Sequence, residues 1–177
     1  HIVALIDRSP LHSESNENWT GVKVFDVTSD VSNDYDELDV ATIDTQELAY
    51  LHDPDTGLHD LDTGNGETLA QFLVWGMTQF PAKNYAVVFG SHGAAWEGLI
   101  TDETAPNSSE TVADIGDVTI LGLGELQAAF ELVLDTTGHD KFALLINDAC
   151  FMSSLEYFSV MQHYFDFSYA SPEVVVN

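Results

Sequence analysis

Apolar and polar positions alternate along the chain in blocks that predict both strands and helices. Strands are predicted at residues 2–6, 22–27, 85–90, 142–147 and 167–171. Among these, the continuous apolar run at 85–90 is typical of a parallel strand whose two faces are both covered, and the runs at 2–6 and 142–147 also predict buried strands. Apolar residues at helical spacing predict helices at residues 67–80, 123–138 and 153–165. Strands that alternate with helices predict an α/β fold with a mainly parallel sheet.

Two polar segments separate these blocks. Residues 29–62 are acidic and contain the turn sequence DPDTG, and a second turn sequence, DTGNG, starts at their last residue, Asp62. Residues 97–119 are rich in Gly, Asp and Ser. We expect both segments to be mainly loops, with at most one short strand or turn in the first.

The length and the apolar content suit one globular domain. The chain has 177 residues, of which 45% are apolar, and this is enough for a substantial core. None of its apolar runs approaches the roughly 20 residues that a membrane span needs. We therefore expect residues 1–177 to form a single domain.

The two ends of the chain indicate that it derives from a longer polypeptide. The first residue is His1 rather than an initiator Met, as after removal of a signal peptide or at an arbitrary boundary. The last residues are an apolar triplet, 174–176, and Asn177, which together resemble a strand cut short. We expect the missing elements of the domain to lie in a continuing or separate chain, with Asn177 as a candidate processing site.

Charge is the strongest compositional signal. Thirty Asp and Glu residues oppose four Lys and Arg residues, which gives a formal net charge of −26. Nucleic acids and anionic membranes are excluded as expected partners, because binding to either needs basic residues. The surface is typical of a protein kept soluble in saline surroundings, where salt screens the repulsion among carboxylates. Calcium binding by some carboxylates is the alternative, although the DPDTG turn lacks the closing Glu of an EF-hand loop.

Cysteine and histidine usage excludes several kinds of site. The single cysteine, Cys150, permits neither an internal disulfide nor a cysteine-rich zinc site. Five of the seven histidines show no metal-ligand spacing to one another: His12, His52, His59, His139 and His163. Two glycosylation sequons, at Asn18 and Asn107, give weak support for export.

Two of the predicted buried strands end close to chemically useful residues. His92 follows the strand at 85–90, and Cys150 follows the strand at 142–147. The carboxyl ends of parallel strands form one edge of a sheet, where open α/β proteins bind their ligands, so these side chains can lie together. A cysteine thiolate attacks carbonyl carbon, and an imidazole can take the thiol proton or stabilise the anion.

Neighbouring features suit the same chemistry. The helix predicted just after Cys150 would direct its positive end at the sulfur. Gly93 allows a substrate to approach the backbone closely, so its N–H and that of Cys150 are candidate oxyanion-hole donors. The competing interpretation is structural, because a single cysteine after an apolar strand is commonly a buried thiol and a histidine at a strand end is commonly solvated. The residue pattern alone leaves both interpretations open.

A family resemblance favours the catalytic interpretation. The stretches YAVVFGSHGAAW and NDACFMSSLE resemble the clostripain family of caspase-like cysteine peptidases, which carry an HG pair and a D-A-C-x-M-x-x-x-E signature. The residues that match this signature are Asp148, Ala149, Cys150, Met152 and Glu156. Residues 63–88 and the YASPEV stretch are also similar to the corresponding family segments, so the resemblance covers residues 62–174 well and the first sixty loosely.

The resemblance implies a caspase-like fold and a Cys–His dyad without an obligatory third acid. Cys150 would be the nucleophile, His92 the general acid and base, and the N–H groups of Gly93 and Cys150 the oxyanion donors. The chemistry would need no cofactor. Met152 and Glu156 would support the segment around the cysteine rather than take part in the reaction.

Substrate specificity is less clearly indicated. By the resemblance, Asp148 would lie in the pocket for the residue before the scissile bond, which implies cleavage after Arg or Lys. Arg8, at the end of the first strand, offers an alternative, because legumain- and caspase-like relatives place a pocket arginine at that edge. Arg8 and Asp148 together would suit an Asn side chain, and self-cleavage after Asn177 would agree with that specificity. In the structural alternative, Arg8 merely pairs with a neighbouring carboxylate such as Asp7.

The sequence is therefore interpreted as part of a secreted or cell-surface cysteine endopeptidase, possessing a Cys–His dyad and expected to cleave after Arg or Lys. Its expected partners are a protein or peptide substrate and a second chain from the same precursor. An Asn-specific, legumain-like peptidase is one alternative. A catalytically silent acidic binding module on the same fold is the other.

Overall fold

The computed structural model describes residues 1–8, 21–27, 41–42, 61–102 and 118–175. These residues belong to two compact units, His1–Leu61 and Asp62–Asn177, and each unit is described by itself. The expectation that residues 1–177 form one domain stays a prediction.

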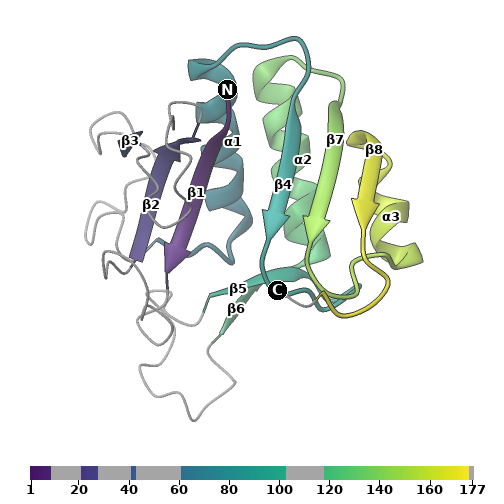
Figure 1. The fold of residues 1–177 in the computed structure, drawn as a ribbon. Helices are drawn as coiled ribbons and strands as arrows, with labels where there is room; N and C mark the ends of the chain where they lie inside the picture. The colour runs from purple at the N-terminus through teal and green to yellow at the C-terminus, as the bar shows by residue number, and fades with distance from the viewer. Residues whose placement is uncertain (9–20, 28–40, 43–60, 103–117, 176–177) are drawn as a thin grey trace. The chain divides into compact units, whose positions relative to one another are not determined.

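The first unit contains an antiparallel sheet. Strands β1 (Val3–Arg8), β2 (Gly21–Asp26) and β3 (Ala41–Thr42) lie in the order β1-β2-β3 (Figure 1). The strands predicted at 2–6 and 22–27 are thus confirmed. The expectation that the first strand is buried is wrong, because its residues are half-buried or exposed, as suits an antiparallel sheet with one face toward solvent.

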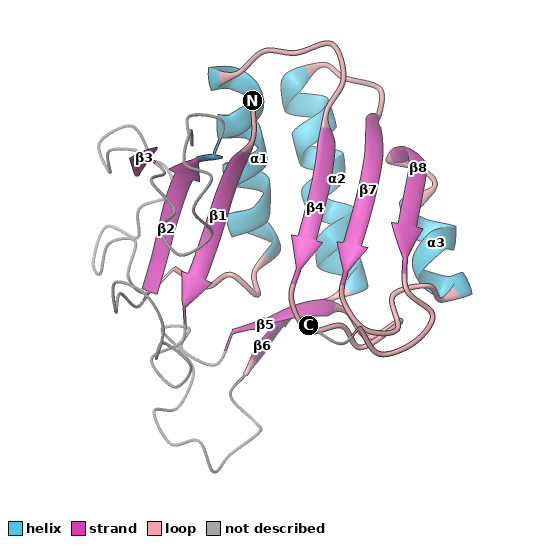
Figure 2. Ribbon diagram, in the orientation of Figure 1, coloured by secondary structure: helices cyan, strands magenta, loops and turns pink. Residues whose placement is uncertain are grey.

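The second unit is built on a parallel sheet. Strands β4 (Ala86–Gly90), β7 (Phe142–Asp148) and β8 (Phe165–Ala170) lie in the order β4-β7-β8, and both pairings are parallel. Helices α1 (Gly66–Gln79), α2 (Leu123–Thr137) and α3 (Leu155–Met161) complete the unit. The predicted α/β fold with a parallel sheet and flanking helices is confirmed (Figure 2).

Local signals explain where the two long helices begin and end. The side chain of Asn65 accepts a hydrogen bond from the N–H of Glu67 (2.8 Å), which caps the start of α1. At the start of α2, the Glu125 carboxylate accepts from the N–H of Gly122 (3.0 Å). Helix α2 ends at Gly138, whose φ of 71° is the left-handed conformation that glycine adopts most easily.

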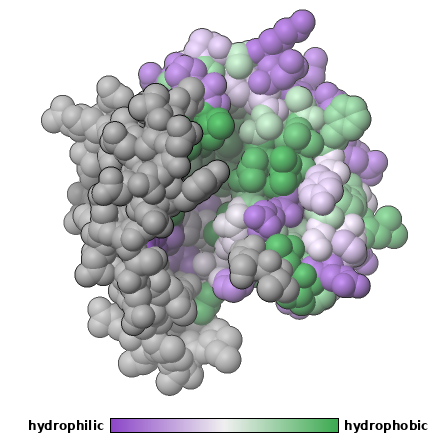
Figure 3. Space-filling view, in the orientation of Figure 1, coloured by the Kyte–Doolittle hydropathy of each residue, from purple (hydrophilic) through white to green (hydrophobic). Residues whose placement is uncertain are grey.

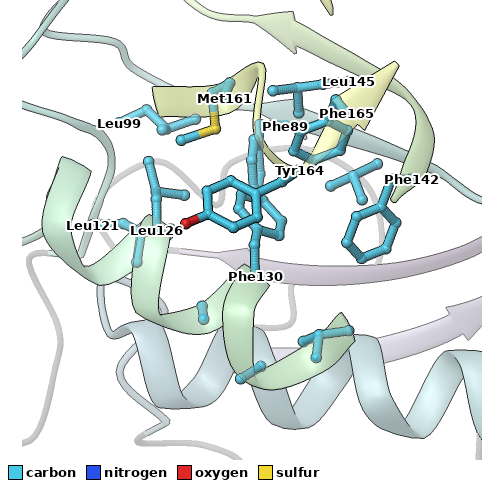
Figure 4. Close-up of a cluster of buried hydrophobic side chains, with 14 of the residues drawn as sticks. Phe89, Leu99, Leu121, Leu126, Phe130, Phe142, Leu145, Met161, Tyr164 and Phe165 are labelled. Atoms are coloured by element: carbon cyan, nitrogen blue, oxygen red, sulfur yellow. The ribbon is translucent and has the colours of Figure 1, made fainter. Parts of the chain in front are cut away.

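Phe130 of α2 lies at the centre of the core of this unit. Its ring centroid is 4.9 Å from that of Phe165, 5.7 Å from that of Phe142 and 6.4 Å from that of Phe89 (Figure 4). All four side chains are at most 4% exposed. Edge-to-face and tilted ring pairs of this kind stabilise more than their buried area alone, so one residue of α2 fixes the helix against all three strands.

Helix α3 and the segment 97–119 differ from the sequence prediction. Helix α3 spans Leu155–Met161 rather than 153–165, because Ser154 caps its start and β8 already begins at Phe165, which is buried in the core. The segment 97–119 is not wholly a loop, because β5 (Leu99–Asp102) and β6 (Thr119–Leu121) lie at its two ends and pair antiparallel. Leu99 and Leu121 pair with each other and are fully buried, so hydrophobic burial accounts for this hairpin.

Candidate active site

Strands β4 and β7 leave the parallel sheet side by side. Gly90 and Asp148 form their last pair, and the N–H of Ser91 donates to the carbonyl oxygen of Asp148 (3.3 Å). His92 and Cys150 therefore each lie two residues beyond the last paired residue of their strand. The structure brings the two segments together at the carboxyl edge of the sheet, where the sequence placed the site.

The backbones of Gly93 and Cys150 are in direct contact. A Cβ atom at position 93 would overlap the carbonyl oxygen of Cys150 and would lie 3.0 Å from both Cγ and Sδ of Met152. Met152 is fully buried, so it cannot move aside freely. Only glycine fits at position 93 without displacing the loop that carries the cysteine.

The loop that carries His92 is held by β5. Gly93 forms an antiparallel bridge with Leu99, the N–H of Ala94 donates to the oxygen of Gly98 (2.9 Å), and the N–H of Ile100 donates to the oxygen of His92 (3.1 Å). The N–H groups of Ala94 and Ile100 make the two hydrogen bonds of this bridge, so the N–H of Gly93 takes part in neither. The imidazole of His92 is exposed.

In the described part of the chain, residues other than glycine with positive φ angles are confined to these two loops and the adjoining strand β5. Positive φ angles in residues other than glycine occur at Ala95 (57°), Ile100 (56°) and Phe151 (59°). Ala95 lies in the His92 loop, Ile100 lies in β5 next to that loop, and Phe151 directly follows Cys150. Such conformations cost of order 1–3 kcal/mol each and cluster at functional sites, which gives independent support for a site here.

Cys150 is half-buried, and its sulfur lies against the segment that follows β8. The N–H of Val175 points at Sγ (3.4 Å), and Sγ lies 3.9 Å from the oxygen of Val175. Two further hydrogen bonds join the segments, from Phe151 N–H to the oxygen of Glu173 (3.1 Å) and from Ser153 N–H to the oxygen of Ser171 (3.0 Å). Residue-level reasoning did not identify Val175, and only the resemblance of YASPEV to a family segment pointed toward this region.

The helix expected to act on the sulfur starts later than predicted. Ser154 is the N-cap of α3 and accepts from the N–H of Tyr157 (3.2 Å), so the first helical residue is Leu155. A helix dipole acts mainly within the first turn, and Cys150 lies outside it. The expected start of this helix just after Cys150, at residue 153, is therefore two residues too early.

A buried polar network lies just before the cysteine. The hydroxyl of Tyr157 donates to Oδ1 of Asn147 (2.7 Å), and Nδ2 of Asn147 donates to the oxygen of Tyr169 (3.3 Å). Asn147 is 2% exposed, and burial raises the pKa of Tyr157 well above its usual value. These bonds connect β7 to both α3 and β8 three residues before Cys150. No sequence pattern signals this role, because an Asn near the end of a strand is ordinary.

A pair of carboxylates ties the start of α1 to the β5–β6 hairpin. Asp62 accepts from the hydroxyl of Thr119 (2.6 Å) and from the N–H of Gly64 (2.9 Å). Buried Asp102 accepts from the N–H (2.9 Å) and the hydroxyl (3.3 Å) of Thr63. Burial chiefly raises the pKa of Asp62, and the charge of Asp102 adds to the effect. Sequence reasoning recognised only turn chemistry at these positions.

The two residues predicted to bind substrate, Asp148 and Arg8, belong to different units of the chain. Asp148 has an exposed side chain at the end of β7, whereas Arg8 ends β1 opposite Gly21 in the first unit. Asn177, both sequons and the DPDTG turn lie outside the described residues. Within the described residues, no group of three or more His, Cys, Asp or Glu side chains is arranged to hold a metal ion. No helix in the described ranges is long and apolar enough to cross a membrane.

The chain shares its fold with secreted bacterial cysteine proteases. A secreted C11 cysteine protease from Bacteroides thetaiotaomicron, solved with an irreversible peptide inhibitor, superimposes with a TM-score of 0.53 at 18% identity over 87% of this chain. An inactive zymogen C11 protease from Parabacteroides distasonis gives a TM-score of 0.51 at 18% identity over 88% of this chain. The caspase-like fold expected from the sequence is confirmed.

The chain spans only part of these relatives. It covers 36% of each of those two chains, and 39% of a second Bacteroides thetaiotaomicron structure. No curated protein sequence matches it. The model of the clostripain family, however, matches residues 11–176, a range that contains His92, Gly93 and Cys150. From this match over nearly its whole length, we conclude that the chain belongs to the clostripain family of C11 cysteine peptidases.

Proposed function

We propose that this chain carries the nucleophile and the general base of a cysteine endopeptidase. The observation that chiefly supports the proposal is the contact between Gly93 and Cys150 at the ends of two paired parallel strands. That contact puts the residue after His92 against the residue that bears the thiol. The positive φ angles of Ala95 in the His92 loop, of Ile100 in the adjoining β5 and of Phe151 beside Cys150 add support, because strain of this kind collects at functional sites.

In the proposed acylation step, Sγ of Cys150 attacks the carbonyl carbon of the scissile peptide bond. His92 accepts the thiol proton and later gives a proton to the departing amine nitrogen. The C–N bond breaks, and a thioester joins the acyl part of the substrate to the sulfur. The exposure of His92 suits this role, because the imidazole must reach both the sulfur and the leaving group.

The N–H groups of Gly93 and Cys150 are the proposed oxyanion donors. Gly93 contributes its N–H to neither hydrogen bond of the bridge with Leu99, so the bridge leaves that group available to a substrate oxygen. Removal of one preorganised oxyanion donor lowers kcat by about 10²–10³ in a well-studied protease. Deacylation then reverses the roles: His92 takes a proton from water, the hydroxide attacks the thioester, and the thiol is regenerated.

The proposed specificity is for Arg or Lys before the scissile bond. Asp148 supports it, because its carboxylate is exposed at the strand end next to the site and would pair with a cationic side chain. The alternative is a mixed Arg8–Asp148 pocket for Asn. Fluorogenic peptides that differ only in Arg, Lys or Asn distinguish the two. Cleavage of the Arg peptide that is lost in Asp148→Ala supports the basic pocket, and cleavage of the Asn peptide alone that is lost in Arg8→Ala contradicts it.

The activity itself is tested by covalent labelling. A peptidyl ketone ending in Arg should alkylate the full polypeptide at Cys150 and nowhere else, as mass spectrometry of the digested product would reveal. Cys150→Ala should abolish peptidase turnover, and His92→Ala should lower it by several orders of magnitude. If the wild-type protein binds the peptide but is neither labelled nor active, the silent binding module becomes the better interpretation.

Further properties of the whole protein belong to the same proposal. We expect a secreted or cell-surface enzyme with a second chain from the same precursor. Self-cleavage after Asn177 belongs to the Asn-specific alternative. We expect no nucleic-acid or anionic membrane partner, because the net charge is −26. The chemistry should need no cofactor, and calcium would act only as a structural ligand. Mass spectrometry of the mature protein would show whether a chain ends at Asn177, and a Cys150→Ala precursor should then stay uncut.

A further inference from the structure

Trp96 is an exposed tryptophan on the loop that carries His92. It is 60% exposed, whereas Trp75, the other tryptophan among the described residues, is 1% exposed in α1. Leaving so large an apolar side chain in water forgoes the stabilisation that its burial would give. Apolar side chains also gather over strands β4, β7 and β8 (Figure 3), so exposure alone does not identify a binding residue. Trp96 differs from them in the backbone that holds it and in its place beside the candidate site.

Trp96 lies in a tight turn with a strained backbone. The N–H of Ala94 donates to the oxygen of Gly98 (2.9 Å), and the N–H of Glu97 donates to the oxygen of Ala94 (3.2 Å). Ala95, directly before the tryptophan, has a φ of 57°, a left-handed conformation that alanine keeps only where its surroundings enforce it. The turn therefore fixes the backbone on both sides of Trp96.

Gly98 anchors this turn on the β5–β6 hairpin. Its φ is 143°, and a Cβ atom at position 98 would overlap the carbonyl oxygen of Leu121 in β6. Leu121 is fully buried, so β6 is a rigid support for the turn. A side chain on a rigid support loses little backbone freedom when it binds a ligand, and this preorganisation favours binding.

The turn lies close to the candidate nucleophile. Strand β5, which follows the turn, lies beyond the carboxyl end of β4 (Figure 1). Trp96 is three residues from Gly93, whose backbone contacts Cys150. Three residues span at most about 11 Å even when fully extended, and a turn shortens that span. An indole and a substrate side chain together can bridge such a distance, so Trp96 is placed to contact a residue next to the bond that Cys150 attacks.

The chemistry of the proposed reaction indicates which substrate residue Trp96 contacts. Asp148, two residues before Cys150, is the proposed contact of the residue before the scissile bond. His92 has to give a proton to the departing amine nitrogen, so the residue after the scissile bond lies on the side of the His92 loop. Trp96 belongs to that loop, four residues after His92.

We propose that Trp96 contacts the substrate residue directly after the scissile bond and selects an apolar side chain there. The proposal rests on the peptidase function proposed above and adds a determinant of specificity to it. Tryptophan is among the residues that most often dominate binding energies, because its flat indole offers a large apolar area with few rotatable bonds. A leucine side chain packed against the indole leaves water together with it, whereas glycine has no side chain to bury.

Paired peptide substrates test the proposal. Internally quenched peptides carry Leu or Gly directly after the scissile bond, and each is made with Arg and with Asn before it. We expect the mature full-length enzyme to cleave the Leu peptide with a kcat/KM about tenfold higher, the lower end of the discrimination that one apolar side chain gives. Trp96→Ala should abolish this preference by slowing cleavage of the Leu peptide alone. Trp96→Phe should retain most of the preference, because a phenyl ring preserves part of the apolar contact.

Glu97→Ala is the matched control, because it changes the next exposed residue of the same turn and should keep the wild-type preference. A second pair of peptides carries Leu or Gly two residues before the bond and Gly after it. If the loss in Trp96→Ala is confined to that pair, equal for Leu and Gly peptides, or absent, the specificity proposal is overturned and the peptidase function stands. Failure of the wild type to cleave any of the peptides would contradict the peptidase function, and the specificity proposal would fall with it.

Binding to an inactive variant provides a measurement without turnover. Cys150→Ala should bind the uncut Leu peptide about tenfold more tightly than the Gly peptide, as calorimetry would measure. Adding Trp96→Ala should remove the difference and leave the affinity for the Gly peptide unchanged. Equal affinities of Cys150→Ala for the two peptides would contradict a contact between Trp96 and the residue after the scissile bond.

Discussion

Gly93 touches the backbone of Cys150 so closely that any side chain at position 93 would overlap the carbonyl oxygen of Cys150. The contact joins the segments that follow two strands whose last residues, Gly90 and Asp148, are 58 positions apart in the chain. It also explains why a glycine follows His92: the Cys150 loop occupies the space that a Cβ atom would need. The HG pair and the cysteine are thus parts of one backbone arrangement.

Gly93→Ala should slow labelling of Cys150 by a peptidyl ketone about 10²-fold, the cost expected when a reacting group is displaced by about 1 Å. The matched control is Gly90→Ala, because a Cβ atom at position 90 meets no atom within 4 Å. Circular dichroism should show that both variants fold. Labelling of Gly93→Ala at the rate of the wild type would mean that the contact does not position the thiol.

Asn147→Ala and Tyr157→Phe should each lower the free energy of unfolding by about 1–3 kcal/mol, because each leaves a buried polar group without its partner. The double variant should lose less than the sum, since both substitutions break the same 2.7 Å hydrogen bond. Urea denaturation measures all three, with exposed Ser159→Ala as the control. Strict additivity would indicate that the two side chains are not coupled.

Asp62→Asn should raise Tm at neutral pH. The pKa of Asp62 is raised in the folded state, chiefly by burial, so its ionised form opposes folding and its protonated form does not. An Asn side chain can still accept from Thr119 and Gly64 without carrying a charge. As the pH falls through the raised pKa and then below the ordinary 3.8, the difference from the wild type should vanish. A gain in Tm that is the same at acidic and neutral pH would contradict this explanation.

Asp102→Ala should loosen the His92 loop. Asp102 holds Thr63 at one end of β5, while near the other end the N–H of Ile100 donates to the oxygen of His92. We expect the amide of Ile100 to exchange its hydrogen faster in the variant, because local opening of β5 costs less. Glu97→Ala, an exposed substitution in the same loop, should leave that exchange unchanged. Unaltered exchange in Asp102→Ala would show that the tie to Thr63 does not reach the loop.

Salt should stabilise the protein strongly. With thirty carboxylates and four basic side chains, Tm should rise with NaCl concentration and then level off as the charges are screened. CaCl2 at equal ionic strength separates screening from specific binding, because a further rise would indicate a calcium site. A Tm that responds to neither salt would contradict the interpretation of the acidic surface.

The sequence by itself determined the elements that depend on local chemistry. Helices α1 and α2 lie within one residue of their predicted bounds, because Asn65 and Gly138 mark their ends and helical periodicity marks their length. The strands β4 and β7 were equally clear, since few structures other than buried strands contain such short continuous apolar runs. Two parallel strands sharing a carboxyl edge were then enough to predict that His92 and Cys150 follow neighbouring strand ends.

Tertiary structure decided the features that depend on contacts between distant parts of the chain: the end of α3, the β5–β6 hairpin and the long-range hydrogen bonds. Helix α3 ends earlier than predicted because Phe165 is buried in the core as the first residue of β8. The β5–β6 hairpin forms because the paired residues Leu99 and Leu121 are both buried. The tie between Asp102 and Thr63 joins residues 39 positions apart, and the Asn147 network depends on a tyrosine of the next helix. Contacts of this range depend on how the elements pack, so a single sequence carries no periodic signal for them. Strand β4 is the converse case, because its continuous apolar run 86–89 indicates burial on both faces, whereas the packing buries Val87 and leaves Val88 62% exposed.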